Sequence, residues 1–134
     1  MSAINEYLCG LNKVISDAPF QLFTNIQSEN RGDAALYVKG DLIFIEGSEL
    51  HVKEYFIAIP VLKRLAYSYH YQDKDKKLIF RYDNADHYTE VETHPHHKHV
   101  GNTVLPSKYK EIKDVIREII NCFISGRGHS SQQS

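Results

Sequence analysis

Four histidines crowd into the segment HPHHKH: His94, His96, His97 and His99. Histidine changes its charge near neutral pH, so such a cluster beside a phosphodiester can supply a general base and a general acid without a cofactor. Imidazole is also a common ligand of transition metals. A polar loop whose histidines bond to the backbone is the third explanation. The sequence disfavours a metal, because it offers no partner cysteine and no H-x-x-x-H helix, and the histidines lie too close together to turn toward one ion.

Two predicted strands upstream carry further polar side chains. Residues 64–72 and 78–83 alternate in polarity as half-buried strands do. Pairing them as neighbours places His70, Arg81 and Asp83 on one face, where Asp83 would orient a histidine and Arg81 would steady the charge that develops on a phosphate. A solvated sheet face with one weak ion pair is the alternative.

Four more residues are candidates for contact with a bound substrate. Lys98 would assist Arg81 in holding a phosphate, and Glu54 is expected on the same sheet face from the preceding strand. Tyr82 and Tyr88 are candidates for stacking on bases. Tyrosine is also a favoured strand residue, so core packing is the alternative for both.

The elements that position these residues indicate an α+β fold. Apolar residues recur at helical spacing over residues 4–15, with Ser2 as cap. Residues 20–83 then form short β-rich segments, and antiparallel hairpins fit their short connections. We therefore predict a meander of about five or six strands. Its turn signals lie at residues 31–33, 39–41, 46–48 and 73–76.

The remaining part of the chain is predicted as loop, helix and tail. Residues 84–106 show neither period, which predicts a long irregular loop that carries the histidines. Ser107 would cap a helix ending near Ser125, and both helices would cover one face of the sheet. We expect one domain over residues 1–125 and a disordered polar tail over residues 126–134.

The composition limits the class of protein. A chain of 134 residues with 42% hydrophobic residues fits one globular domain, and its net charge of -1 argues against a general nucleic-acid coat protein while leaving room for a local patch. Cys9 and Cys122 lack the spacing of redox or zinc sites, so we expect them buried in a reducing compartment. With no run of about 20 apolar residues, the protein is expected in the cytoplasm and off the membrane, and no cofactor is expected.

Several strings of the sequence resemble the TumE-type toxin family of bacterial and archaeal toxin–antitoxin systems. They are YSYHYQD (67–73), LIFRYDNA (78–85), HPHHKH (94–99) and LPS (105–107). The resemblance covers about the central third of the chain and implies a small cytoplasmic toxin with an antitoxin as its partner. The chain departs from relatives at Asp86-His87-Tyr88, where proline and paired histidines are more frequent. Roles are therefore transferred only to the FRYDN and PHHKH strings.

Two functions follow as hypotheses. The first is a toxin that cleaves RNA without a metal, one histidine removing the proton from a ribose 2′-hydroxyl and another protonating the leaving oxygen. The second is a non-catalytic module that binds nucleic acid or protein. Either would be compatible with an antitoxin segment covering the active face, and a homodimer is also compatible with the sequence. The residues expected to be catalytic are His70, Arg81, Asp83, His96, His97 and His99.

Overall fold

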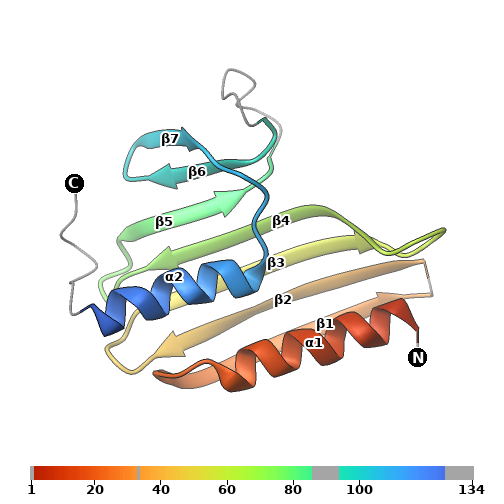
Figure 1. Cartoon of the computed structure of the whole chain (residues 1–134), viewed down its shortest axis with the longest axis horizontal. Coiled ribbons are helices and arrows are strands. Elements are labelled where there is room, and N and C mark those ends of the chain that lie inside the picture. Colours follow the sequence, from red (N-terminus) through yellow and green to blue (C-terminus); the bar gives the residue numbers. More distant parts are fainter. Residues whose placement is uncertain (1, 33, 86–93, 126–134) are drawn as a thin grey trace.

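The computed structural model describes residues 2–32, 34–85 and 94–125. In these residues seven strands form one antiparallel sheet in chain order, and two helices lie over one face of it (Figure 1). The predicted α+β meander is confirmed, with a strand count above the expected five or six. The elements are α1 (Ala3–Asp17), β1 (Gln21–Arg31), β2 (Ala35–Phe44), β3 (Glu49–Ile57), β4 (Lys63–Gln72), β5 (Leu78–Asp83), β6 (His97–Val100), β7 (Thr103–Pro106) and α2 (Ile112–Ile124).

The first helix begins where the sequence predicts. The Ser2 side chain accepts a hydrogen bond from the Asn5 amide at 3.1 Å and so satisfies one of the orphan donors of the first turn. Cys9, which we expected to be buried, lies on the exposed side of α1 because it is off the apolar stripe. The buried stripe consists of Ile4, Leu11 and Ile15.

The second helix begins later than predicted. Ser107 is not its cap: the helix starts after Glu111, whose amide donates to the Asp114 carboxylate at 3.0 Å. The Glu111 side chain in turn accepts from the backbone amide of Asp114. This reciprocal pair satisfies two backbone amides at the start of the helix without a serine or threonine hydroxyl. The side chains that α2 buries against the sheet are Ile112, Val115, Ile116 and Ile119.

Alternate residues of the strands point toward the helices and form the core. Tyr67, Tyr69 and Tyr71 of β4 are buried on this side, as their alternation predicts, and Phe44 of β2 packs edge-on against Tyr71. Both helices thus cover the same face, and the opposite face is left without a helix in the described residues (Figure 1). We call this opposite side the uncovered face.

Two predicted connections are wrong. Residues 39–41 are not a turn, because they lie within β2. The predicted loop of residues 84–106 contains the hairpin of β6 and β7, so three of the clustered residues, His97, Lys98 and His99, lie on a strand. That hairpin accounts for the two strands beyond the five that end at Asp83.

Some predictions are not tested by the described residues. The predicted tail of residues 126–134 lies outside them, and so do His87 and Tyr88. The cytoplasmic location stays a prediction. Among the described residues, no helix has the length and apolar character needed to span a membrane.

Position 40 of β2 is a glycine because the neighbouring strand β1 comes too close to leave room for a side chain. A Cβ placed there would meet the backbone oxygen of Asn25 at 2.1 Å and the Cα of Ile26 at 2.6 Å. Gly40→Ala is therefore expected to lower the free energy of unfolding by about 1–3 kcal/mol, measured by urea unfolding. Gly10→Ala is the matched control: its Cβ meets nothing within 4 Å on α1, so that variant should be more stable by about 0.5–1 kcal/mol. An unchanged midpoint for Gly40→Ala would contradict this account of β2.

Candidate functional site

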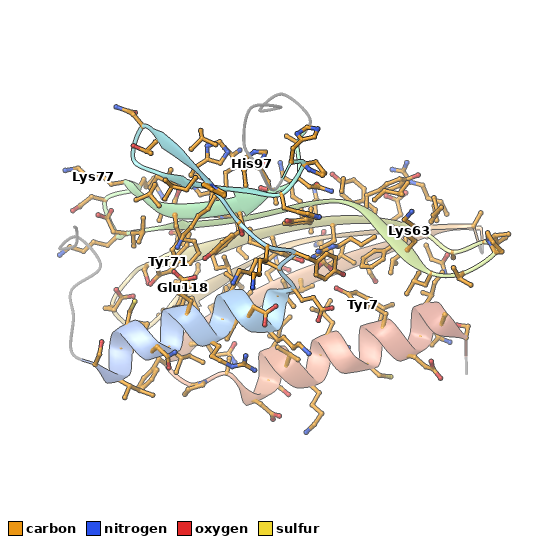
Figure 2. The ribbon with its side chains drawn as sticks, turned by 45° about the horizontal axis from the view of Figure 1, so that its top comes forward. Tyr7, Lys63, Tyr71, Lys77, His97 and Glu118 are labelled. Atoms are coloured by element: carbon orange, nitrogen blue, oxygen red, sulfur yellow. The ribbon has the colours of Figure 1, made fainter. Side chains whose placement is uncertain are left out.

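Two rows of polar side chains cross the uncovered face from β3 to β6. Paired residues of antiparallel strands share a face, so the register defines both rows. The predicted common face of His70, Arg81 and Asp83 is confirmed. Figure 2 shows His97 on this part of the sheet, whereas Tyr7, Tyr71 and Glu118 lie between sheet and helices. The first row is His51, His70, Arg81 and His99, and the second is Lys53, Ser68, Asp83 and His97.

A groove follows these rows. Its volume is about 580 Å³, and its lining is mostly polar and comes from the first five strands. Lys39, Lys53 and Arg81 bring positive charge to it, the kind of charge that attracts a phosphate backbone. Neither lysine was predicted from the sequence as a residue of the site. The signal that would have found them is the alternation of Lys39 with Asp41 and of His51 with Lys53, which puts all four side chains on one strand face.

Asp83, His97 and His99 converge at one end of the rows. The Asp83 Oδ1 atom lies 2.5 Å from His97 Nε2, and its Oδ2 atom lies 3.3 Å from His99 Nε2. The Nε atom of Arg81 is 3.5 Å from the same Oδ2. His97 is fully buried and Asp83 is 6% exposed, so these groups are held rigidly. We call Asp83, His97 and His99 the triad.

A backbone contact fixes the orientation of His97. Its Nδ1 atom lies 2.8 Å from the carbonyl oxygen of Pro95, which has no proton of its own and must accept one. Nδ1 therefore carries hydrogen, and Nε2 is the atom presented to Asp83. The two histidines of the triad face each other edge-on, with ring centroids 4.9 Å apart.

The environment favours uncharged imidazoles beside Arg81. Burial and the nearby Arg81 guanidinium lower the pKa of His70 below its ordinary 6.5. Burial likewise lowers the pKa of His99, and the attraction of Asp83 only partly opposes it. At neutral pH both rings hold an unprotonated nitrogen, which can accept a proton or bind a metal.

Three of the predicted site residues lie on the helix side of the sheet and not on the uncovered face. Lys98 and Tyr82 are cross-strand partners on the helix side, where both contact Glu118 of α2: the distances are 3.1 Å from Lys98 Nζ and 2.6 Å from the Tyr82 hydroxyl. Lys98 therefore cannot assist Arg81 on the uncovered face, and Tyr82 is 4% exposed. His96 also turns to the helix side, stacked on Tyr67 with its Nδ1 atom 2.8 Å from the Tyr67 hydroxyl.

Glu54 was expected on the face of His70 and is on the other one. Its carboxylate accepts hydrogen bonds from the hydroxyls of Tyr7 on α1 and Tyr69 on β4, and it is 2% exposed. Burial raises the pKa of Glu54 above its ordinary 4.5. The nearest cation is Arg64, whose Nη1 atom lies 4.0 Å from Glu54 Oε2.

Arg64 reaches Glu54 because the sheet is irregular there. Tyr55 of β3 pairs with Ala66, but the next residue, Phe56, pairs with Arg64, so one residue of β4 is skipped. This bulge moves the Arg64 side chain from the predicted polar face to the helix side. There it donates to the Tyr69 hydroxyl and to the Lys110 carbonyl, each at 2.5 Å. We call Tyr7, Glu54, Arg64 and Tyr69 the buried polar network; it links α1, the sheet and the segment before α2.

The triad changes the argument about metals. The sequence disfavoured a metal on the ground that the histidines are too close together to share an ion. Because β6 is a strand, its side chains alternate, and His97 and His99 point to the same face while Lys98 points to the other. Their ligand atoms and one Asp83 oxygen all lie within 4.8 Å of one another. The metal alternative is therefore open on geometric grounds.

Comparison with known protein families identifies a match. The model of a family described as toxin TumE matches residues 11–126, which include every strand of the sheet and the triad. No curated protein and no solved structure is significantly similar to the chain.

Proposed function

The chain belongs to the TumE toxin family of toxin–antitoxin systems, and from this premise we propose that it acts as a toxin by cleaving RNA on the uncovered face of its sheet. The observation that carries the proposal is the position of Arg81 between two imidazoles. Its cross-strand partners are His70 on β4 and His99 on β6, and the cationic groove leads up to them. A phosphate held by Arg81 lies between two imidazoles, each with an unprotonated nitrogen at neutral pH.

The reaction that fits these groups is attack of a ribose 2′-hydroxyl on the adjacent phosphorus. The bond from the 2′-oxygen to phosphorus forms, the bond to the 5′-oxygen breaks, and the products are a 2′,3′-cyclic phosphate and a 5′-hydroxyl. His70, uncharged at neutral pH, accepts the 2′-hydroxyl proton. Arg81 stabilises the charge on the phosphate. On the triad side the 5′-oxygen takes its proton from a water molecule, and the hydroxide that remains takes back the proton held by His70.

The family also implies an antitoxin as the partner of the chain. We propose that a segment of this antitoxin lies over the uncovered face, where it would block the groove. A non-catalytic role remains the second candidate function, because the same lysines of the groove, Lys39 and Lys53, would hold RNA without cleaving it. It predicts binding that weakens steeply with salt and yields no fragments.

Growth of a bacterial host tests the proposal. Induction of the wild-type chain should arrest growth with loss of intact total RNA, and Arg81→Gln should abolish both effects because the phosphate loses its charged partner. Arg117→Gln is the matched control: this arginine is exposed on α2, near Asp114, and far from the uncovered face in the fold. Arrest without RNA fragments would favour the binding role instead, and an equal loss of toxicity in Arg117→Gln would contradict the assignment of Arg81.

A further inference from the structure

We propose that the triad of Asp83, His97 and His99 binds one divalent transition-metal ion. The sequence gives this site a compact signature, an aspartate that ends β5 and a His-x-His pair on the adjacent strand. The site is distinct from Arg81 and His70, which need no metal for the roles given to them above.

The ligand atoms of the triad all lie within 4.8 Å of one another, and the two spacings to Asp83 suit a single ion. Metal–nitrogen and metal–oxygen bonds of about 2.0–2.2 Å put neighbouring ligand atoms of one ion about 2.8–3.6 Å apart, for octahedral and tetrahedral geometry. Asp83 Oδ2 and His99 Nε2 are 3.3 Å apart, and Asp83 Oδ1 and His97 Nε2 are 2.5 Å apart. A rotation of the carboxylate that lengthens the second contact by a few tenths of an ångström brings both into this range.

One hydrogen bond at the triad is of a kind that is common at metal sites. Histidine ligands commonly donate their second nitrogen to a backbone carbonyl, which fixes the ring and its tautomer. His97 does this toward Pro95. Arg81 in turn lies beside the Asp83 carboxylate. Pro95 therefore orients His97, and Arg81 lies against Asp83, before any ion is bound.

The contact between His97 and Asp83 also favours a bound cation. With hydrogen on Nδ1, a neutral His97 turns the lone pair of Nε2 toward an oxygen of Asp83, although both atoms are acceptors. A cation shared by the two atoms removes this repulsion. A second proton on His97 would also remove it, and the measurement below separates the two cases.

The ligand types restrict which ions fit. Two imidazoles and one carboxylate suit zinc, manganese, iron, cobalt or nickel, whereas magnesium and calcium prefer oxygen alone. Three protein ligands leave coordination positions for water or a substrate oxygen. If the chain cleaves RNA as proposed, those positions lie next to Arg81, where an ion would contact the same phosphate; this role depends on the proposed function, but metal binding itself does not.

Metal binding is measured on the full chain without a histidine tag and without RNA. After treatment with chelator, the wild type is titrated with Zn²⁺ by calorimetry and with Co²⁺ by visible absorption. We expect one ion per chain, with Co²⁺ bands that Zn²⁺ displaces. Asp83→Asn and His99→Gln should each weaken Zn²⁺ binding by at least about 100-fold. Circular dichroism checks that both variants are folded.

His96→Gln is the matched control, because His96 neighbours the triad in sequence but lies on the helix side. It should bind Zn²⁺ as the wild type does. Equal Zn²⁺ affinity in the wild type and in Asp83→Asn would overturn the proposal, and it would leave a proton as the shared cation. So would a loss in His96→Gln as large as the loss in His99→Gln. Because RNA is absent from the titration, failure of the metal site and failure of RNA cleavage are separate results.

Discussion

Arg64→Met is expected to lower the free energy of unfolding by about 3–5 kcal/mol at pH 8, the largest effect on stability that we expect from a single substitution. The guanidinium is buried with its side chain 5% exposed, and it lies over the rings of Tyr67 and Tyr109 at 3.9 and 4.5 Å. Methionine fills similar space but leaves the Glu54 carboxylate in the core without its cation. Urea unfolding followed by circular dichroism measures the loss.

A double variant separates the lost charge pair from lost packing. Glu54→Gln/Arg64→Met removes both charges and keeps an acceptor oxygen for one of the Tyr7 and Tyr69 hydroxyls, so it should be more stable than Arg64→Met alone. The pH dependence has a definite sign. Burial raises the pKa of folded Glu54 above its ordinary 4.5, so the folded chain keeps a proton that the unfolded chain loses, and stability falls as pH rises from about 4.5. The deficit of Arg64→Met should therefore shrink toward pH 5. If the losses in free energy of unfolding of Glu54→Gln and Arg64→Met added up to the loss of the double variant, the pairing of Glu54 with Arg64 would be contradicted.

Asp83→Asn is expected to lower the rate of RNA cleavage by about 10²–10⁴-fold without unfolding the chain. Asp83 is shared by His97, His99 and Arg81, so its charge holds three groups of the site together. The amide has similar size but turns a donor toward one of its partners. The rate is measured with purified protein and a labelled RNA in excess of the protein.

The control for Asp83→Asn is Asp17→Asn. Asp17 is exposed at the end of α1, where it pairs only weakly with Lys13 at 3.2 Å, and its substitution should leave the rate unchanged. Asp83→Glu adds a second check, because it restores the charge and should recover part of the rate if charge matters. Full activity in Asp83→Asn would contradict a role of the triad in RNA cleavage.

The part of the site that lies on β4 and β5 was predictable because one face of each strand is buried. A slip of the register by one residue would expose Tyr69 and Tyr71, which excludes it. His70 and Arg81 must therefore share the other face. The position of Arg64 was not predictable. The bulge in β4 reverses the alternation, and no residue type in the segment marks it.

The strand that carries the triad was hidden for a different reason. β6 and β7 have four residues each; three of the four in β6 are histidine or lysine, and β7 ends in proline, so neither strand shows an apolar alternation. The hairpin signal that was present is Gly101, whose φ of 58° suits the turn between them. Recognising that turn would have placed His97 and His99 on one face and Lys98 on the other.

Incubation of the purified chain with RNA tests the central claim most directly, namely that the uncovered face is where the toxin cleaves RNA. The wild type should yield fragments that end in a 2′,3′-cyclic phosphate and begin with a 5′-hydroxyl, and Arg81→Gln, folded by circular dichroism, should yield none. RNA that is bound by the wild type but stays intact, or fragments formed equally by both proteins, would contradict the account.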